Sequence, residues 1–430
     1  MPAKKKGGKK GKGKGKKKKK IKGLLESPDE LVKRLMKVYT TVCQDKLTAI
    51  CPGIRKFLKE CLDDNKLCVK FILEPIPDYD DSELSNVQLE PLIQALRNER
   101  YKYVKEIYVW DIVLQHTDVA SLVSIKFGYK CILLFYRSCN LFSTLTVLCF
   151  DYNEFGDEGV YGIAKGLKNN RTLLSLSLCY CDLGITSGKL LGDTVATTAL
   201  RELYLNGNNL ESEGAVELIK LVTDNAKVEH YEREEAARLK SEEAAQVALD
   251  EKAKLMTLVN SGSDKISESG GEKEDETKSE KSGSAKSRKG GLTGKKKKKK
   301  GKKKKKKKEP PPPPAVGPWL HKLHLADNGI DAYSKGSTFA PVICMNLFKE
   351  LIMHSDCLKE LDLDDNLIGD LGGKEILEGL QQRKEFGLNS MKVSVTHRMM
   401  LPDTFSSIIK LGAGLKKKKK KKGKGKKKKK

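Results

Sequence analysis

A leucine pattern that recurs every 27–28 residues constrains the fold of this chain more than any other feature. Its clearest copies follow a form close to LxxLxLxxN and begin at Leu145, Leu173 and Leu200. Two more copies begin at Leu320 and Leu358, after a long interruption. A repeated unit of this length holds one strand and one helix, and it buries its apolar face only by stacking on its neighbours.

Weaker copies flank these five, one around Ile107 and the other around Val393. Ile107 and Leu148 hold the same place in successive copies but are 41 residues apart, so residues 117–142 fit no ordinary repeat. Two interpretations of this segment stay open. It is either an irregular repeat or a foreign stretch introduced by an error in the gene model.

Each copy predicts a short strand with its leucines pointing into the core, followed by an Asn or Cys that can hydrogen-bond the turn. Between the copies, helical spacing predicts helices over 158–167, 187–195 and 213–222. The sequence therefore predicts an α/β solenoid, with parallel strands on its concave face and helices on its convex face.

The residues of the first turn carry a family resemblance. Asn153-Glu154-Phe155-Gly156-Asp157-Glu158-Gly159 resembles the turn into the helix in leucine-rich repeats of the ribonuclease-inhibitor subtype. Residues 104–108 and 170–178, together with the order of repeats, charged helix and lysine-rich insert, resemble a leucine-rich repeat family of cilia and sperm flagella. That resemblance implies a cytoplasmic protein of the ciliary or flagellar axoneme.

Changes in composition divide the chain into segments. A helix is expected to start at Ser27-Pro28, and the lysine-rich insert is expected to loop out between two adjacent repeats. The predicted segments are a disordered lysine-rich tail (1–23), a helical N-terminal cap (24–100), leucine-rich repeats (101–227), a charged helix (228–259), a disordered Lys/Pro-rich insert (260–318), C-terminal leucine-rich repeats and cap (319–412), and a disordered lysine-rich tail (413–430).

Three lysine tracts account for the formal net charge of +27. Residues 1–22, 295–308 and 416–430 each hold 13 lysines and no acid, which leaves the other 379 residues at −12. Lysine without arginine or interleaved aromatics favours charge attraction to an acidic polymer over base reading. The candidate polyanion-binding residues are Lys16, Lys17, Lys18, Lys302, Lys303, Lys304, Lys426, Lys427 and Lys428.

The outward strand positions of the repeats predict a protein-binding face, because aromatic side chains contribute much of the energy of protein interfaces. The candidate partner-binding residues are Tyr152, Tyr180, Tyr204, Glu202, Glu360, Asp362, Asp364 and Asp365. We also expect the acidic cluster among them to be able to dock the lysine tracts of the same chain.

No motif for catalysis, a cofactor or a metal ion emerges, and the apolar run 131–150 is broken by Arg137, so no membrane span is expected. The sequence thus predicts a non-enzymatic adaptor without a small-molecule substrate, whose lysine tracts attach it to axonemal microtubules. Two alternatives stay open. One is a nuclear or nucleolar protein that binds RNA non-specifically, and the other is a regulator of a Ran-type GTPase, whose family has an acidic tail instead of a lysine tail.

Overall fold

The structure is a computed structural model. It describes residues 27–76, 86–112, 114, 144–168, 170–262, 314–331 and 339–413. The chain forms two units, Met1–Lys227 with Pro314–Lys430, and Val228–Pro313. The nine candidate lysines, the predicted disordered segments apart from a few residues at their borders, and residues 117–142 lie outside the described ranges.

The first unit contains one parallel sheet whose strand order follows the chain order. Its strands are β1 (Lys70–Leu73), β2 (Glu106–Val109), β3 (Val147–Cys149), β4 (Ser175–Ser177), β5 (Glu202–Tyr204), β6 (Lys322–His324), β7 (Glu360–Leu363) and β8 (Lys392–Val395). Leu203 of β5 lies opposite Leu176 of β4 on one side and Leu323 of β6 on the other. The predicted α/β fold of parallel strands is confirmed, and β5 and β6 are neighbours although residues 205–321 separate them.

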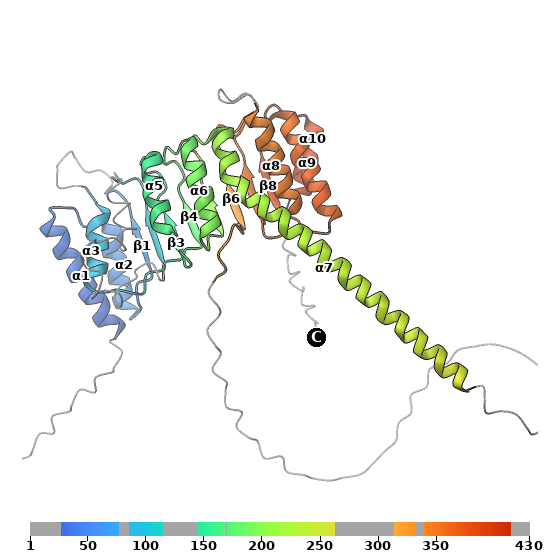
Figure 1. The fold of residues 1–430 in the computed structure, drawn as a ribbon. Helices are drawn as coiled ribbons and strands as arrows, with labels where there is room; N and C mark the ends of the chain where they lie inside the picture. The colour runs from blue at the N-terminus through green and yellow to red at the C-terminus, as the bar shows by residue number, and fades with distance from the viewer. Residues whose placement is uncertain are drawn as a thin grey trace, which may run out of the picture. The chain divides into compact units, whose positions relative to one another are not determined.

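The helices are α1 (Pro28–Asp45), α2 (Pro52–Asp63), α3 (Leu89–Asn98), α5 (Gly156–Leu167), α6 (Ile185–Thr197), α7 (Glu211–Gly262), α8 (Ala340–His354), α9 (Gly369–Glu385) and α10 (Pro402–Leu411). Those of the first unit, with the first part of α7, lie side by side along one face of the sheet (Figure 1). Across the part of the chain that the structure describes, none of them is both long and apolar enough to cross a membrane.

The repeat helix predicted over 213–222 and the charged helix predicted over 228–259 form the single helix α7. No glycine or proline occurs between Gly214 and Gly262, so nothing in the sequence interrupts the backbone hydrogen bonds of the helix. The part of α7 in the second unit is charged and largely exposed, with one-turn ion pairs such as Arg238 to Glu242 at 3.7 Å. Such exposed pairs each contribute only a few tenths of a kcal/mol.

The segment predicted as a helical N-terminal cap contains α1, α2 and α3 and also contributes β1 to the sheet. Phe71 and Leu73 of this strand are buried, and β1 pairs in parallel with β2. The strand keeps the repeat spacing, but Cys68 and Phe71 stand in place of the first two leucines, which is why the leucine pattern did not reveal it. The predicted helix start is confirmed at Ser27, whose hydroxyl accepts a hydrogen bond of 3.3 Å from the backbone N–H of Glu30.

The core of the first unit is built from the repeat leucines, and a ladder of buried asparagines, interrupted by Cys181, closes the turns that follow β3 to β7. Asn208 shows the pattern: its Oδ1 accepts from the N–H groups of Cys181 (3.0 Å) and Leu183 (3.1 Å). Its Nδ2 donates to the carbonyls of Leu178 (2.9 Å) and Leu205 (2.7 Å). The buried side chain therefore satisfies backbone groups of its own repeat and of the preceding one, as the sequence predicts.

Candidate functional site

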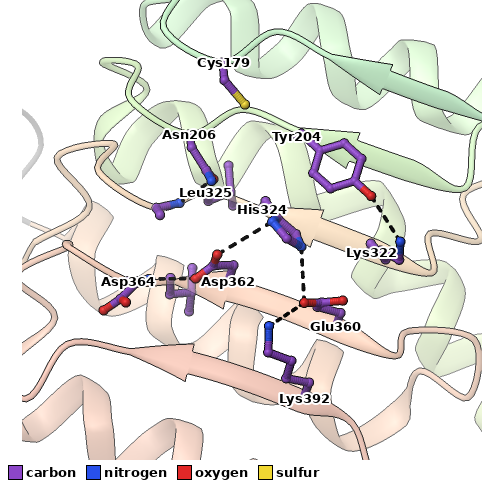
Figure 2. Close-up of polar contacts among 12 residues, drawn as sticks. Cys179, Tyr204, Asn206, Lys322, His324, Leu325, Glu360, Asp362, Asp364 and Lys392 are labelled. Carbon is purple, nitrogen blue, oxygen red and sulfur yellow. Dashed lines mark hydrogen bonds and ion pairs between the residues drawn. The ribbon is translucent and has the colours of Figure 1, made fainter. Parts of the chain in front are cut away.

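The outward side chains of the strands form the strand face, and the parallel register aligns them in rows across the sheet. One row contains Glu202, Lys322, Glu360 and Lys392, at equivalent positions of β5 to β8. Lys322 Nζ lies 2.9 Å from Glu202 Oε1. Lys392 Nζ lies 2.6 Å from Glu360 Oε1 (Figure 2). The charges of this row therefore compensate one another.

These pairs shift the titration of the two glutamates. Burial raises the pKa of Glu202, but the hydrogen bond and charge of Lys322 outweigh it, so the pKa lies below its ordinary value. Glu360 follows the same pattern, with burial opposed by Lys392, and its pKa is also lowered. Both carboxylates are ionised at neutral pH and are already paired within the protein.

The next row places His324 between Tyr204 and Asp362 (Figure 2). The Tyr204 and His324 rings meet edge to face, with centroids 4.7 Å apart. His324 Nδ1 lies 3.6 Å from Asp362 Oδ2, and its Nε2 lies 3.6 Å from Glu360 Oε1. Burial, together with the charges of Lys392 and Lys322, lowers the pKa of His324 by more than the two carboxylates raise it, which favours a neutral imidazole at pH 7.

A further row follows the ends of the strands and contains Tyr152, Tyr180, Gly207, Asp327 and Asp365. All five have positive φ, between 52° and 69°. The Tyr152 and Tyr180 rings stack with centroids 5.0 Å apart and an interplanar angle of 4°, and the side chains are 56% and 44% exposed. The Tyr180 ring lies over Gly207, where a Cβ would come within 2.2 Å of Cε1.

Only two of the three tyrosines named from the sequence therefore form one feature. Tyr152 and Tyr180 are stacked at the strand ends, whereas Tyr204 lies within the strand face and pairs with Glu202 and Lys322. Their positions in the repeat explain the difference. Tyr204 lies between the two buried residues of its LxL strand, whereas Tyr152 and Tyr180 each lie two residues beyond the second buried residue of theirs. The reading of three successive tyrosines missed this distinction.

Acidic residues gather where the strands end. The turns 150–157, 178–185, 205–212, 325–331 and 363–370, which we call the strand-end edge, hold ten Asp or Glu residues and no Lys or Arg. Some of these acids hold the turns together: Asp151 Oδ1 accepts from Ser177 Oγ at 2.6 Å and from Cys179 N at 2.9 Å. The Thr396 hydroxyl donates to Asp364.

The predicted acidic cluster thus splits into two groups. Glu360 and Asp362 belong to the paired rows of the strand face, while Asp364 and Asp365 belong to the strand-end edge. Lys392, which neutralises Glu360, was missed because the repeat around Val393 is weak. In the described ranges, no group of three or more His, Cys, Asp or Glu side chains has the arrangement of a metal site.

Comparison with known families agrees with this architecture. The sequence model of a family described as Leucine Rich repeat matches residues 143–164, 198–218 and 354–377. Each matched segment contains one strand and the start of the helix that follows it, namely β3 with α5, β5 with α7, and β7 with α9.

The chain contains leucine-rich repeats. The structure extends the repeats beyond the matched segments, because β4, β6 and β8 have the same parallel pairing as β3, β5 and β7. The search of curated proteins finds no match to the chain. Leucine-rich repeat folds typically serve as scaffolds for protein binding, and their strand face is an extended surface suited to that role.

Proposed function

We propose that this leucine-rich repeat protein is a non-enzymatic scaffold that binds a protein partner through the strand face and the strand-end edge. The exposed, stacked pair of Tyr152 and Tyr180 carries this proposal. Two large aromatic side chains held against each other present a rigid apolar surface, and aromatic side chains of this kind are frequent hot spots of protein interfaces.

The backbone supports the same conclusion. Tyr152 and Tyr180 occupy left-handed conformations that Asp or Gly occupies in the later repeats. A left-handed conformation costs a bulky side chain about 1–2 kcal/mol. Folding alone does not require tyrosine at these positions, because Gly207 closes the equivalent turn of the next repeat without a side chain.

A partner-capture experiment with matched variants tests the proposal. Tyr152→Ala with Tyr180→Ala removes the stacked pair, and Tyr161→Ala removes an equally exposed tyrosine (58%) from the outer surface of α5. We expect loss of a protein captured by the unaltered chain with the double variant and retention with Tyr161→Ala. Equal recovery of every captured protein with both variants would contradict the proposal.

For the lysine tracts we propose attachment to an acidic polymer, with axonemal microtubules as the target and the cytoplasm of a cilium or flagellum as the location. The support is the charge of the sequence, with 13 lysines and no acid in each tract, and the ciliary family resemblance. Attraction of this kind weakens steeply as salt rises, because it releases counterions from the polymer.

Cosedimentation with microtubules tests the attachment. We expect binding to intact microtubules and its loss when the acidic tubulin tails are removed or the tracts are deleted. Binding that persists without the tails would refute tail recognition. Binding to RNA in place of microtubules would favour the nuclear or nucleolar alternative.

A further inference from the structure

Among the described residues, four acids of the strand-end edge lack the kind of lysine partner that neutralises Glu202 and Glu360 on the strand face. Glu154, Asp182, Asp327 and Asp365 form no salt bridge with any residue of the described ranges. Asp327 and Asp365 hold the same place in their repeats as Tyr180 does, two and three strands further along the sheet, and burial, Tyr152 and these two carboxylates raise the pKa of Tyr180. An unneutralised acidic surface therefore adjoins the exposed tyrosine pair.

The C-terminal lysine tract starts from the same unit. Ala413 forms an antiparallel bridge with Lys392 of β8, and Val393 N donates to the carbonyl of Gly412 at 3.0 Å. The bridge fixes the position of Ala413, the last residue that the structure describes, beside the start of β8. The tract 416–430 carries 13 lysines and no acid, which complements the charge of the strand-end edge.

The chain that follows Ala413 is long enough to reach this surface. Asp365 lies five residues beyond Glu360, the register partner of Lys392, which is about 16 Å along a strand. Crossing the sheet from β8 to β3, which Tyr152 and Glu154 follow, adds about 24 Å at the usual spacing of strands. The 17 residues from 414 to 430 extend to about 56 Å.

We propose that the C-terminal tract 416–430 docks on the strand-end edge, with lysine ammonium groups beside Glu154, Asp327 and Asp365 and over the exposed rings of Tyr152 and Tyr180. Linkage within one chain gives the tract a high effective concentration at this surface. Docked lysines cover the tyrosine pair, so the tract competes with the protein partner, and an acidic polymer that takes up the tract exposes the partner site. This regulatory role rests on the proposed function, whereas the docking itself does not.

The C-terminal tract fits this surface better than the other two. The tract 1–22 precedes α1, at the end of the unit marked by β1, while five of the edge acids (Asp327, Asp331, Asp364, Asp365 and Asp370) follow β6 and β7. The tract 295–308 belongs to the other unit. The site also differs from the acidic cluster expected from the sequence, because Glu360 and Asp362 already face Lys392 and His324.

A binding cycle on the full chain tests the docking. An edge variant combines Glu154→Gln, Asp327→Asn and Asp365→Asn, and Asn tolerates the left-handed backbone of the last two positions. A control variant combines Glu60→Gln, Asp193→Asn and Glu385→Gln, three exposed acids on the helices. The probe is a fluorescent poly-glutamate peptide at low ionic strength, and each variant is measured with and without residues 414–430.

Neutralising the edge should release the tract and tighten binding of the probe. Each exposed ion pair contributes a factor of about two, so three pairs predict about eightfold tighter binding, and the control variant should change it by less than about twofold. The gain should vanish when residues 414–430 are deleted. A gain that survives the deletion, or equal gains in the edge and control variants, would overturn the proposal.

A second measurement identifies the occupant directly. A synthetic peptide of residues 414–430 should bind the chain that ends at Ala413 and should bind it about eightfold more weakly when that chain carries the edge variant. Equal binding to the edge and control variants would assign the edge to a different occupant, a partner's basic segment or a second copy of the chain, and would refute docking of the tract. Neither measurement involves the protein partner, so failure here leaves the scaffold proposal intact, and failure of partner capture leaves the docking intact.

Discussion

Replacing Asn208 with alanine should be among the most destabilising single changes in this protein. The Asn208 side chain is 3% exposed and forms two hydrogen bonds as acceptor and two as donor, at 2.7–3.1 Å. Alanine would leave the N–H groups of Cys181 and Leu183 without these acceptors inside the core. At about 1 kcal/mol for each lost hydrogen bond, Asn208→Ala should lower the free energy of unfolding by about 4 kcal/mol.

Denaturant unfolding followed by far-UV circular dichroism measures this loss, and two further variants calibrate it. Asn209→Ala changes the neighbouring residue, whose side chain makes one long contact of 3.4 Å to Asp182, and should cost less than about 0.5 kcal/mol. Asn208→Cys should cost about half as much as Asn208→Ala. The preceding repeat already has Cys181 at this position, and its Sγ donates to the carbonyl of Phe150 at 3.1 Å.

The reasoning fails if Asn208→Ala costs less than about 1 kcal/mol, because unpaired buried N–H groups are more expensive than that. It also fails if Asn208→Ala and Asn209→Ala have the same effect. Either result would mean that the asparagine ladder does not hold successive repeats together in the way that the hydrogen bonds indicate.

Three further predictions follow from the packing and the titration of the site. Leu203→Ala, at a fully buried strand position, should lower the free energy of unfolding by about 3–4 kcal/mol in the same assay, and a loss below about 1 kcal/mol would contradict its place in the core. Gly207→Ala should displace the Tyr180 ring and destabilise the fold by about 1–2 kcal/mol, because it adds a Cβ at φ +69° directly under that ring; unchanged near-UV circular dichroism would argue against this contact. The lowered pKa of His324 means that the unfolded chain binds a proton more readily, so stability should fall as the pH drops below the ordinary value of 6.5. His324→Gln should flatten this slope in unfolding curves measured across that pH range, and an unchanged slope would assign it to other groups.

The sequence was sufficient to predict the repeat fold because the leucine spacing reports directly on burial. Leu148, Leu176 and Leu203 are register partners on three neighbouring strands, and their regular spacing is visible in the sequence whatever residues the turns contain. The asparagine ladder could be predicted for the same reason, since each Asn stands at a fixed distance from the leucines. Strand β1 has the same spacing with only one leucine, in Cys68, Phe71 and Leu73, so the leucine pattern did not identify it and its pairing with β2 does.

The site was harder to predict, because its chemistry depends on which side chains meet across repeats. Lys322 and Lys392 lie far from Glu202 in sequence, and only the register of β5 to β8 shows that the charges of this row alternate and compensate. The stacking of Tyr152 on Tyr180 depends on a left-handed backbone at both residues and on the absence of a side chain at Gly207. Propensity and hydrophobic pattern do not encode those features.

Site-specific photo-crosslinking tests the central claim, that the strand face and its edge are the partner-binding surface, most directly. A photoreactive phenylalanine derivative is placed at Tyr180 in one version of the full chain and at Tyr161, on α5, in another. Both positions are exposed tyrosines, so each tolerates an aromatic replacement. We expect one discrete crosslinked protein from position 180 that is absent from position 161. The same adducts from both positions, or a discrete adduct from position 161 alone, would contradict this claim.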